Sequence, residues 1–120
     1  MKGQLSYKRI YDKATPEDGA RILVDRLWPR GIKKEEAKLT AWRKEITPSA
    51  ELRKAYHHKD ISYEQFAAAY RMEIEQNKAW PAFVHAVAER LQSGPVTLLT
   101  AAKDVVHSHI PVLMAALAET

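Results

Sequence analysis

The sequence contains no cysteine among its 120 residues and no long apolar run. The absence of cysteine excludes disulfides, thiolate metal sites and cysteine nucleophiles, and it is typical of proteins from a reducing cytoplasm. No stretch is long and apolar enough to span a bilayer, and the first residues lack the apolar core of a signal peptide. We therefore expect a cytoplasmic protein without a membrane segment.

The composition is that of an ordinary soluble globular protein. Charged residues make up 28% and hydrophobic residues 46% of the chain, and its length suffices to bury a core without disulfide or metal staples. No internal repeat, linker or low-complexity segment is present in the sequence. We therefore expect residues 1–120 to form a single α/β domain, for the reasons given below.

Positive charge is concentrated in the first third of the chain. Residues 1–44 hold 12 Lys and Arg against six Asp and Glu, a net +6, whereas residues 45–120 hold seven against nine, a net −2. A basic segment indicates an anionic partner, such as a phosphate, a nucleotide, an acidic metabolite or a nucleic acid. The alternative is a solvated helix surface of mixed charge, which fits the lysines of residues 33–38 beside Glu35 and Glu36.

Apolar runs predict the strands. Residues 20–24 are short, apolar and β-branched, as in a strand buried on both faces, and residues 95–100 give a second strong strand signal. Residues 5–11 alternate imperfectly and are predicted as a first strand, and residues 42–46 as an edge strand. Residues 15–19 combine a capping threonine, a proline and a glycine, which predicts a turn or one helical turn.

Helical periodicity and capping residues predict the helices. Ser62 and Gln65 have the spacing of a capping box and precede apolar residues at helical intervals. Pro111 is compatible only with the first turn of a helix, which places the start of the last helix near Ser108. The predicted helices cover residues 47–56, 62–74, 80–91 and 109–118, and residues 33–39 are predicted as a short helix or a turn. Helices between apolar strands favour an α/β fold with a small, mostly parallel sheet flanked by helices.

Polar segments follow the two strongest strands. If residues 22–24 and 96–99 are parallel neighbours, their carboxyl ends lie at the same edge of the sheet, where open α/β sheets bind ligands. Residues 25–31 leave this edge after the first of these strands, and residues 100–109 leave it after the second. We therefore expect both segments to face one crevice.

The first of these segments, residues 25–31, combines two arginines, a carboxylate and an indole. Arg26 and Arg30 are either ligands of an anion or structural bridges between loops, and the glycine after Arg30 permits close approach of the backbone. Asp25 is either a catalytic acid or base, or an ion-pair partner that orients one of the arginines. Trp28 either stacks on a ligand or fills the core beneath the loop.

The second segment surrounds the start of the last helix with hydrogen-bond donors. Lys103, His107 and His109 lie near the free N–H groups and the positive dipole end of that helix, and an arginine of the first segment would complete an anion cradle. If chemistry occurs there, His107 or Asp25 would transfer protons. The loop has no glycine, which excludes a phosphate-binding P-loop. The histidines lack a recognised metal-site pattern, so we expect no metal, and the sequence indicates no particular cofactor.

Taken together, these segments resemble the short bacterial branch of domain-of-unknown-function family 488. The resemblance covers nearly the whole chain, and the run Asp-Arg-Leu-Trp-Pro-Arg-Gly is its most specific part. It rests on residues 18–32, 42, 44–46, 48–49, 51–54, 96–99, 102–104 and 107. The resemblance implies a small cytoplasmic α/β protein with no established activity.

Two positions depart from the pattern of this family. Short-branch relatives carry a tyrosine where this chain has Thr100 and an asparagine near Ser108. The same resemblance implies that longer members of the family carry Cys-Ala-Glu at positions 100–102. At the positions of Ser108 and His109 it implies Cys-His. Because this chain has neither the thiol nor the acid there, the resemblance implies no cysteine- or glutamate-based chemistry for it.

Three functions are compatible with the sequence. The first is an enzyme or binding protein for a small anionic molecule, for example a phosphorylated one, held by Arg26, Arg30, Lys103 and His107. The second is a nucleic-acid-binding module that uses the basic first third, although no helix-turn-helix or aromatic RNP pattern is present. The third is a protein-interaction module with a charged loop. The convergence of cations favours the first, and the sequence indicates neither a reaction nor an oligomeric state.

Overall fold

Four parallel strands form the centre of the computed structural model, which describes residues 3–120. The sheet has the order β1-β4-β2-β3, with β1 at Leu5–Arg9, β2 at Ala20–Leu23, β3 at Ala41–Trp42 and β4 at Val96–Thr100. Strand β4 pairs in parallel with both β1 and β2, and Leu23 lies opposite Leu99. The predicted parallel pairing of the two strongest strands is confirmed, and so is the α/β class.

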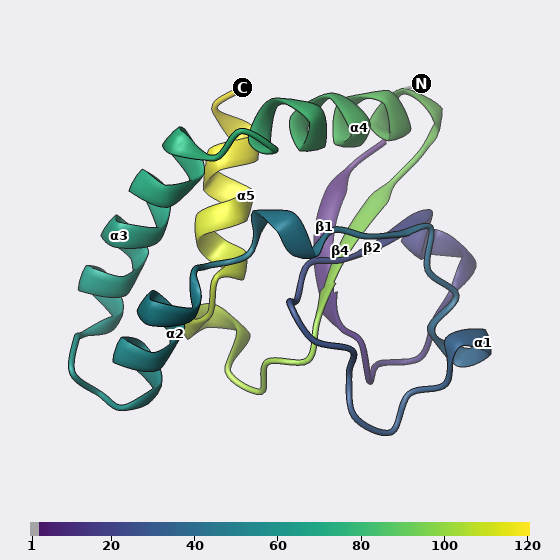
Figure 1. Ribbon diagram of the computed structural model, residues 1–120. Coiled ribbons are helices and arrows are strands. Elements are labelled where there is room, and N and C mark those ends of the chain that lie inside the picture. The colour runs from purple at the N-terminus through teal and green to yellow at the C-terminus, as the bar shows by residue number, and fades with distance from the viewer. Residues whose placement is uncertain (1–2) are drawn as a thin grey trace.

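Five α-helices surround the sheet within residues 3–120. They are α1 (Lys34–Ala37), α2 (Ala50–His57), α3 (Tyr63–Gln76), α4 (Trp80–Ser93) and α5 (Ile110–Ala118). Figure 1 shows α2, α3 and α5 on one side of the sheet and α4 across one end of the strands, whereas α1 and long loops lie on the other side. Ser62 and Gln65 form the predicted capping box of α3, and Pro111 occupies the first turn of α5. None of these helices is long and apolar enough to cross a membrane.

Residues 42–46 differ from their prediction as an edge strand. Only Ala41–Trp42 is extended, at the open edge of the sheet, and Lys44–Ile46 forms a 3-10 helix. Ile46 is fully buried, and its carbonyl accepts a hydrogen bond of 2.6 Å from the hydroxyl of Tyr70 on α3. Contact with a helix, which the local pattern does not reveal, therefore decides the conformation of this segment.

Hydrophobic side chains cover both faces of the sheet. The face toward α2 to α5 contributes alternate residues of β2 and β4 to the larger core, together with Phe66, Tyr70 and Phe83 of the helices. The opposite face forms a smaller cluster around Leu23 and Leu99, under α1 and the loop after β2. Both central strands are therefore buried on two sides, as their continuous apolar runs predicted.

A buried ion-pair cluster fixes the start of β2. Asp18, which is 5% exposed, ends the predicted helical turn as part of the 3-10 helix Pro16–Asp18. Its carboxylate accepts hydrogen bonds from Lys8 Nζ at 3.0 Å and from the buried guanidinium of Arg21. Burial raises the pKa of Asp18, but the hydrogen bonds from the backbone of Thr15 and from the two cations outweigh burial and lower the pKa to about 2.

Candidate functional site

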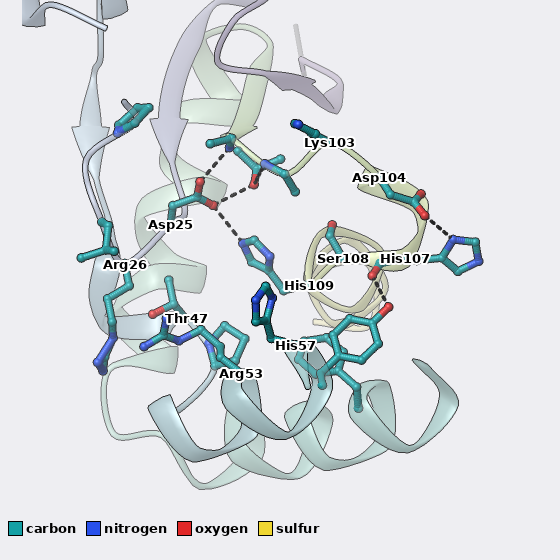
Figure 2. Close-up of a pocket in the computed structure, with 18 of the residues that line it drawn as sticks. Asp25, Arg26, Thr47, Arg53, His57, Lys103, Asp104, His107, Ser108 and His109 are labelled. Atoms are coloured by element: carbon teal, nitrogen blue, oxygen red, sulfur yellow. Dashed lines mark hydrogen bonds and ion pairs between the residues drawn. The ribbon is translucent and has the colours of Figure 1, made fainter. Parts of the chain in front are cut away.

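A pocket of about 940 Å³ opens at the carboxyl edge of the sheet. The loop after β2, the loop between β4 and α5, and helix α2 form its wall, as Figure 2 shows. All seven candidate residues from the sequence line it: Asp25, Arg26, Trp28, Arg30, Lys103, His107 and His109. The two polar segments therefore meet at one crevice, as predicted, and the roles of their residues in binding or catalysis stay predictions.

Asp25 joins the two loops through its carboxylate, which is 15% exposed. Its Oδ2 accepts a hydrogen bond from the N–H of Ala101 at 2.7 Å, and its Oδ1 accepts one from the hydroxyl of Thr100 at 2.8 Å. His109 Nε2 lies 3.3 Å from Oδ1 and 2.7 Å from the carbonyl oxygen of Val24. Burial raises the pKa of Asp25, but the hydrogen bonds from His109, Ala101 and Thr100 outweigh burial and hold the pKa below its ordinary value.

The expectation that Asp25 pairs with Arg26 or Arg30 is wrong. Within residues 3–120 its carboxylate bonds neither arginine, and both arginine side chains are exposed. The reason is the register of the sheet, because Asp25 follows β2 two positions after the pair formed by Leu23 and Leu99. Its short side chain therefore reaches the backbone that leaves the neighbouring strand, at Ala101, before it reaches a flexible arginine.

Helices α2 and α3 hold the loop between β4 and α5. The hydroxyl of Tyr56 donates a hydrogen bond of 2.8 Å to the carbonyl of His107, and the hydroxyl of Tyr63 donates one of 2.9 Å to the carbonyl of Ser108. His107 Nδ1 lies 2.9 Å from Asp104 Oδ2, and both side chains are exposed. The imidazole of His107 therefore stands at the rim of the pocket beside a carboxylate.

Three of the predicted cations, Arg26, Arg30 and Lys103, lack acidic partners. Their side chains are exposed, and within residues 3–120 none of them forms an ion pair or a side-chain hydrogen bond. The backbone carbonyl of Arg30 accepts a hydrogen bond of 2.9 Å from the hydroxyl of Tyr11, which anchors the loop without using the guanidinium. These three charged groups are therefore available to a ligand.

Helix α2 contributes residues to the pocket that the sequence did not single out. Arg53, Lys54 and His57 line the wall, and Lys59 follows just beyond the helix. The Nε atom of Arg53 is buried, and it has no hydrogen-bond partner within residues 3–120. The cluster of cations near the end of this helix was a visible signal, but only the docking of α2 shows which of them face the sheet edge.

Trp28 lies beneath the loop in the smaller core. Its Nε1 donates a hydrogen bond of 2.7 Å to the carbonyl of Ile32, and its ring meets Trp42 edge to face, with the ring centroids 5.4 Å apart. Trp42 Nε1 in turn donates to the carbonyl of Asp25 at 2.7 Å. The structure therefore supports a core-filling role for Trp28, while its contact with the pocket leaves ligand stacking as a prediction.

The hydroxyl groups of the pocket are already hydrogen-bonded. Thr100 Oγ1 is fully buried and donates to Asp25, and Ser108 Oγ donates to the carbonyl of Val105 at 2.7 Å. Neither therefore presents the activated hydroxyl that nucleophilic catalysis requires. Within the described part of the chain, no group of three or more His, Asp or Glu side chains is placed to hold a metal ion. The charged groups of this pocket that have no acidic partner within residues 3–120 are the lysines and arginines that line it.

Comparison with known proteins identifies relatives along almost the full chain. A family model described as "Inactive DUF488-N3 subclade" matches residues 4–120. The chain is 47% identical over 106 residues to the uncharacterised protein YeaO of Escherichia coli, which covers 88% of this chain and 90% of that protein. It is 37% identical over 105 residues to uncharacterised proteins of Mycobacterium bovis and Mycobacterium tuberculosis, covering 88% of this chain and 86% of each. No solved structure matches at a significant level.

Proposed function

The chain belongs to the DUF488-N3i family, the inactive DUF488-N3 subclade, and from this premise we propose that it binds a small anionic molecule without converting it. The ligand lies in the pocket at the carboxyl edge of the sheet, within reach of Arg26, Arg30 and Lys103. The observation that carries the proposal is the surplus of unpaired cations around this pocket.

The charges that line the pocket favour an anion. Six Lys and Arg side chains line the pocket, against only two carboxylates. Both carboxylates already have partners, because His109 lies beside Asp25 and His107 lies beside Asp104. The six cations form no ion pair within residues 3–120. A concave surface of one sign concentrates counter-ions, and planar guanidinium groups hold carboxylates and phosphates through paired hydrogen bonds.

The contacts of the titratable groups support binding rather than turnover. The carboxylate of Asp25 accepts hydrogen bonds from Thr100 and Ala101, and these bonds together with the nearby His109 lower its pKa, which makes it a weak base. His109 directs Nε2 to Asp25 and to a backbone carbonyl. Thr100 is buried and donates its hydroxyl hydrogen to Asp25, so it offers no free nucleophile to the pocket. The residues that remain open to the pocket are the cations.

Thermal unfolding in the presence of anions tests the proposal. Phosphate, pyrophosphate, citrate and phenyl phosphate are compared at equal ionic strength, and at least one of them should raise the Tm, because a ligand that binds only the native state stabilises it. Arg30→Ala should remove most of this increase. The Tm of the free variant should stay unchanged, since the Arg30 side chain is exposed and only its carbonyl holds Tyr11.

Arg90→Ala is the matched control for this experiment. Arg90 is exposed on α4, outside the residues that line the pocket, and its loss changes the net charge by the same amount. The control should keep the full increase in Tm. The proposal fails if no anion raises the Tm, or if both variants lose the increase equally. Binding of duplex DNA or RNA that weakens steeply with salt, without binding of small anions, would assign the basic face to nucleic acid instead.

A further inference from the structure

We propose that Arg26 and Arg53 form the anion subsite of the pocket and hold the dianionic group of an aromatic phosphate monoester. This inference rests on the proposed function and deepens it, because it names the pair of residues that binds the charged group and the class of molecule that carries it. Arg53, which the sequence placed in the family resemblance but not among the candidate site residues, becomes a residue that determines specificity.

Arg53 is held on a fixed element but lacks a partner for its side chain. Ser49 caps helix α2 by accepting a hydrogen bond from the N–H of Leu52, and Glu73 of α3 accepts hydrogen bonds from the hydroxyl and the N–H of Ser49. The Arg53 Nε is nevertheless buried without an acceptor among residues 3–120. A buried donor without an acceptor lowers stability, so its presence beside an open pocket indicates that a ligand supplies the acceptor.

Arg26 approaches the same place from the other side of the pocket. Figure 2 shows its side chain, which leaves the loop after β2, directed toward the side chain of Arg53 on α2. The two carboxylates that line the pocket bond other groups, Asp25 with Thr100 and Asp104 with His107. The two guanidinium groups therefore have no acidic partner within residues 3–120, and both face the pocket with their charge uncompensated.

A doubly charged ligand group compensates both arginines. A phosphate monoester carries nearly two negative charges at neutral pH and presents three acceptor oxygens. These oxygens match the planar donor forks of two guanidinium groups, each of which forms paired hydrogen bonds. One carboxylate would neutralise only one of the two arginines, so the arrangement favours the phosphate group.

The remaining wall of the pocket fits an aromatic group on the same ligand. A volume of about 940 Å³ greatly exceeds the space that a free phosphate ion needs. Leu27 is 72% exposed on this wall, and the half-buried rings of Trp28 and Tyr56 also line it. A flat ring that covers this surface gains free energy from removing apolar area from water. Aryl phosphates and nucleoside monophosphates share this chemistry.

Isothermal titration calorimetry with three probes tests the assignment. Phenyl phosphate, adenosine 5′-monophosphate and inorganic phosphate are titrated at about pH 8, where the esters are dianions. We expect at least one ester to bind about tenfold or more tightly than inorganic phosphate, because only the esters bury apolar surface. The ester that binds better distinguishes a simple aryl group from a nucleoside.

Two variants of Arg53 separate a binding role from a structural one. Arg53→Met keeps the apolar stem and removes the guanidinium, and it should weaken ester binding about ten- to hundredfold. The Tm of this variant without ligand should equal or exceed that of the wild type, since the substitution removes an unsatisfied buried donor. Arg53→Lys keeps the charge and loses the planar fork, and should weaken binding about tenfold. Arg90→Met is the matched control and should bind like the wild type.

Each possible result supports or overturns a specific claim. Ester binding that Arg30→Ala weakens and Arg53→Met leaves unchanged overturns the subsite while the proposed function stands. A lower Tm of free Arg53→Met with unchanged affinity makes Arg53 structural and also overturns it. Equal affinities for the esters and for inorganic phosphate overturn the aromatic class. The absence of binding by all three probes and by every other anion overturns the proposed function as well.

Discussion

Replacing Asp18 with Asn should destabilise the protein at neutral pH and remove part of its sensitivity to acid. The pKa of Asp18 is lowered from 3.8 to about 2 in the folded protein, where Lys8 and Arg21 hold its carboxylate. One pKa unit corresponds to about 1.4 kcal/mol, so ionised Asp18 contributes about 2 kcal/mol to the free energy of unfolding at pH 7. Because the folded pKa is depressed, this contribution is present above the unfolded pKa and is lost as the pH falls through the folded pKa. About half of it is lost by about pH 3.

Arg21 increases the effect of the substitution at neutral pH. It is 4% exposed, so Asp18→Asn leaves a buried guanidinium with only neutral partners. Removing one member of a buried ion pair costs about 3–5 kcal/mol, because the other charge loses its compensation. We therefore expect the substitution to lower the free energy of unfolding by about 3–5 kcal/mol at pH 7. At about pH 3 the decrease should be about 1 kcal/mol smaller.

Urea unfolding followed by circular dichroism at both pH values measures these differences. Asp60→Asn is the matched control, because Asp60 is exposed and its side chain forms no ion pair within residues 3–120. The free energy of unfolding of the control should lie within about 0.5 kcal/mol of the wild-type value at either pH. The difference in the free energy of unfolding between the wild type and Asp18→Asn should be smaller at about pH 3 than at pH 7. An equal difference at both pH values would refute the assignment of a depressed pKa to Asp18.

Two further substitutions test the link between the two loops of the pocket and the turn that precedes β2. Asp25→Asn should lower the free energy of unfolding by about 2–3 kcal/mol in urea at pH 7, because an amide accepts fewer of the hydrogen bonds that Asp25 receives; a change below about 0.5 kcal/mol contradicts its role as the link between the loops. Gly19→Ala should lower the free energy of unfolding by at least about 3 kcal/mol, since Gly19 has φ 63° and an added Cβ would overlap the carbonyl oxygen of Pro95. An unchanged Tm of this variant would show that the turn adapts.

Local sequence information sufficed for most of the secondary structure. The apolar runs at residues 20–24 and 95–100 predicted the central strands, because a continuous apolar run is the pattern of a strand buried on both faces. The capping box at Ser62 and the position of Pro111 predicted two helix starts, since both features satisfy backbone groups within one turn. Residues 44–46 were mispredicted because their conformation depends on a helix distant in sequence.

The sequence by itself determined that a polar segment directly follows each of two apolar strands, because the apolar runs fix where each segment begins. It predicted that the two segments meet at one edge if these strands are parallel neighbours. Only the tertiary structure decided which side chains act together there. The register of β2 against β4 directs Asp25 to Ala101 and Thr100 rather than to an arginine. The docking of α2 brings Arg53 into the same pocket. Such contacts join residues far apart in the chain, and the balance of burial and hydrogen bonding that selects them acts only once the elements are packed together.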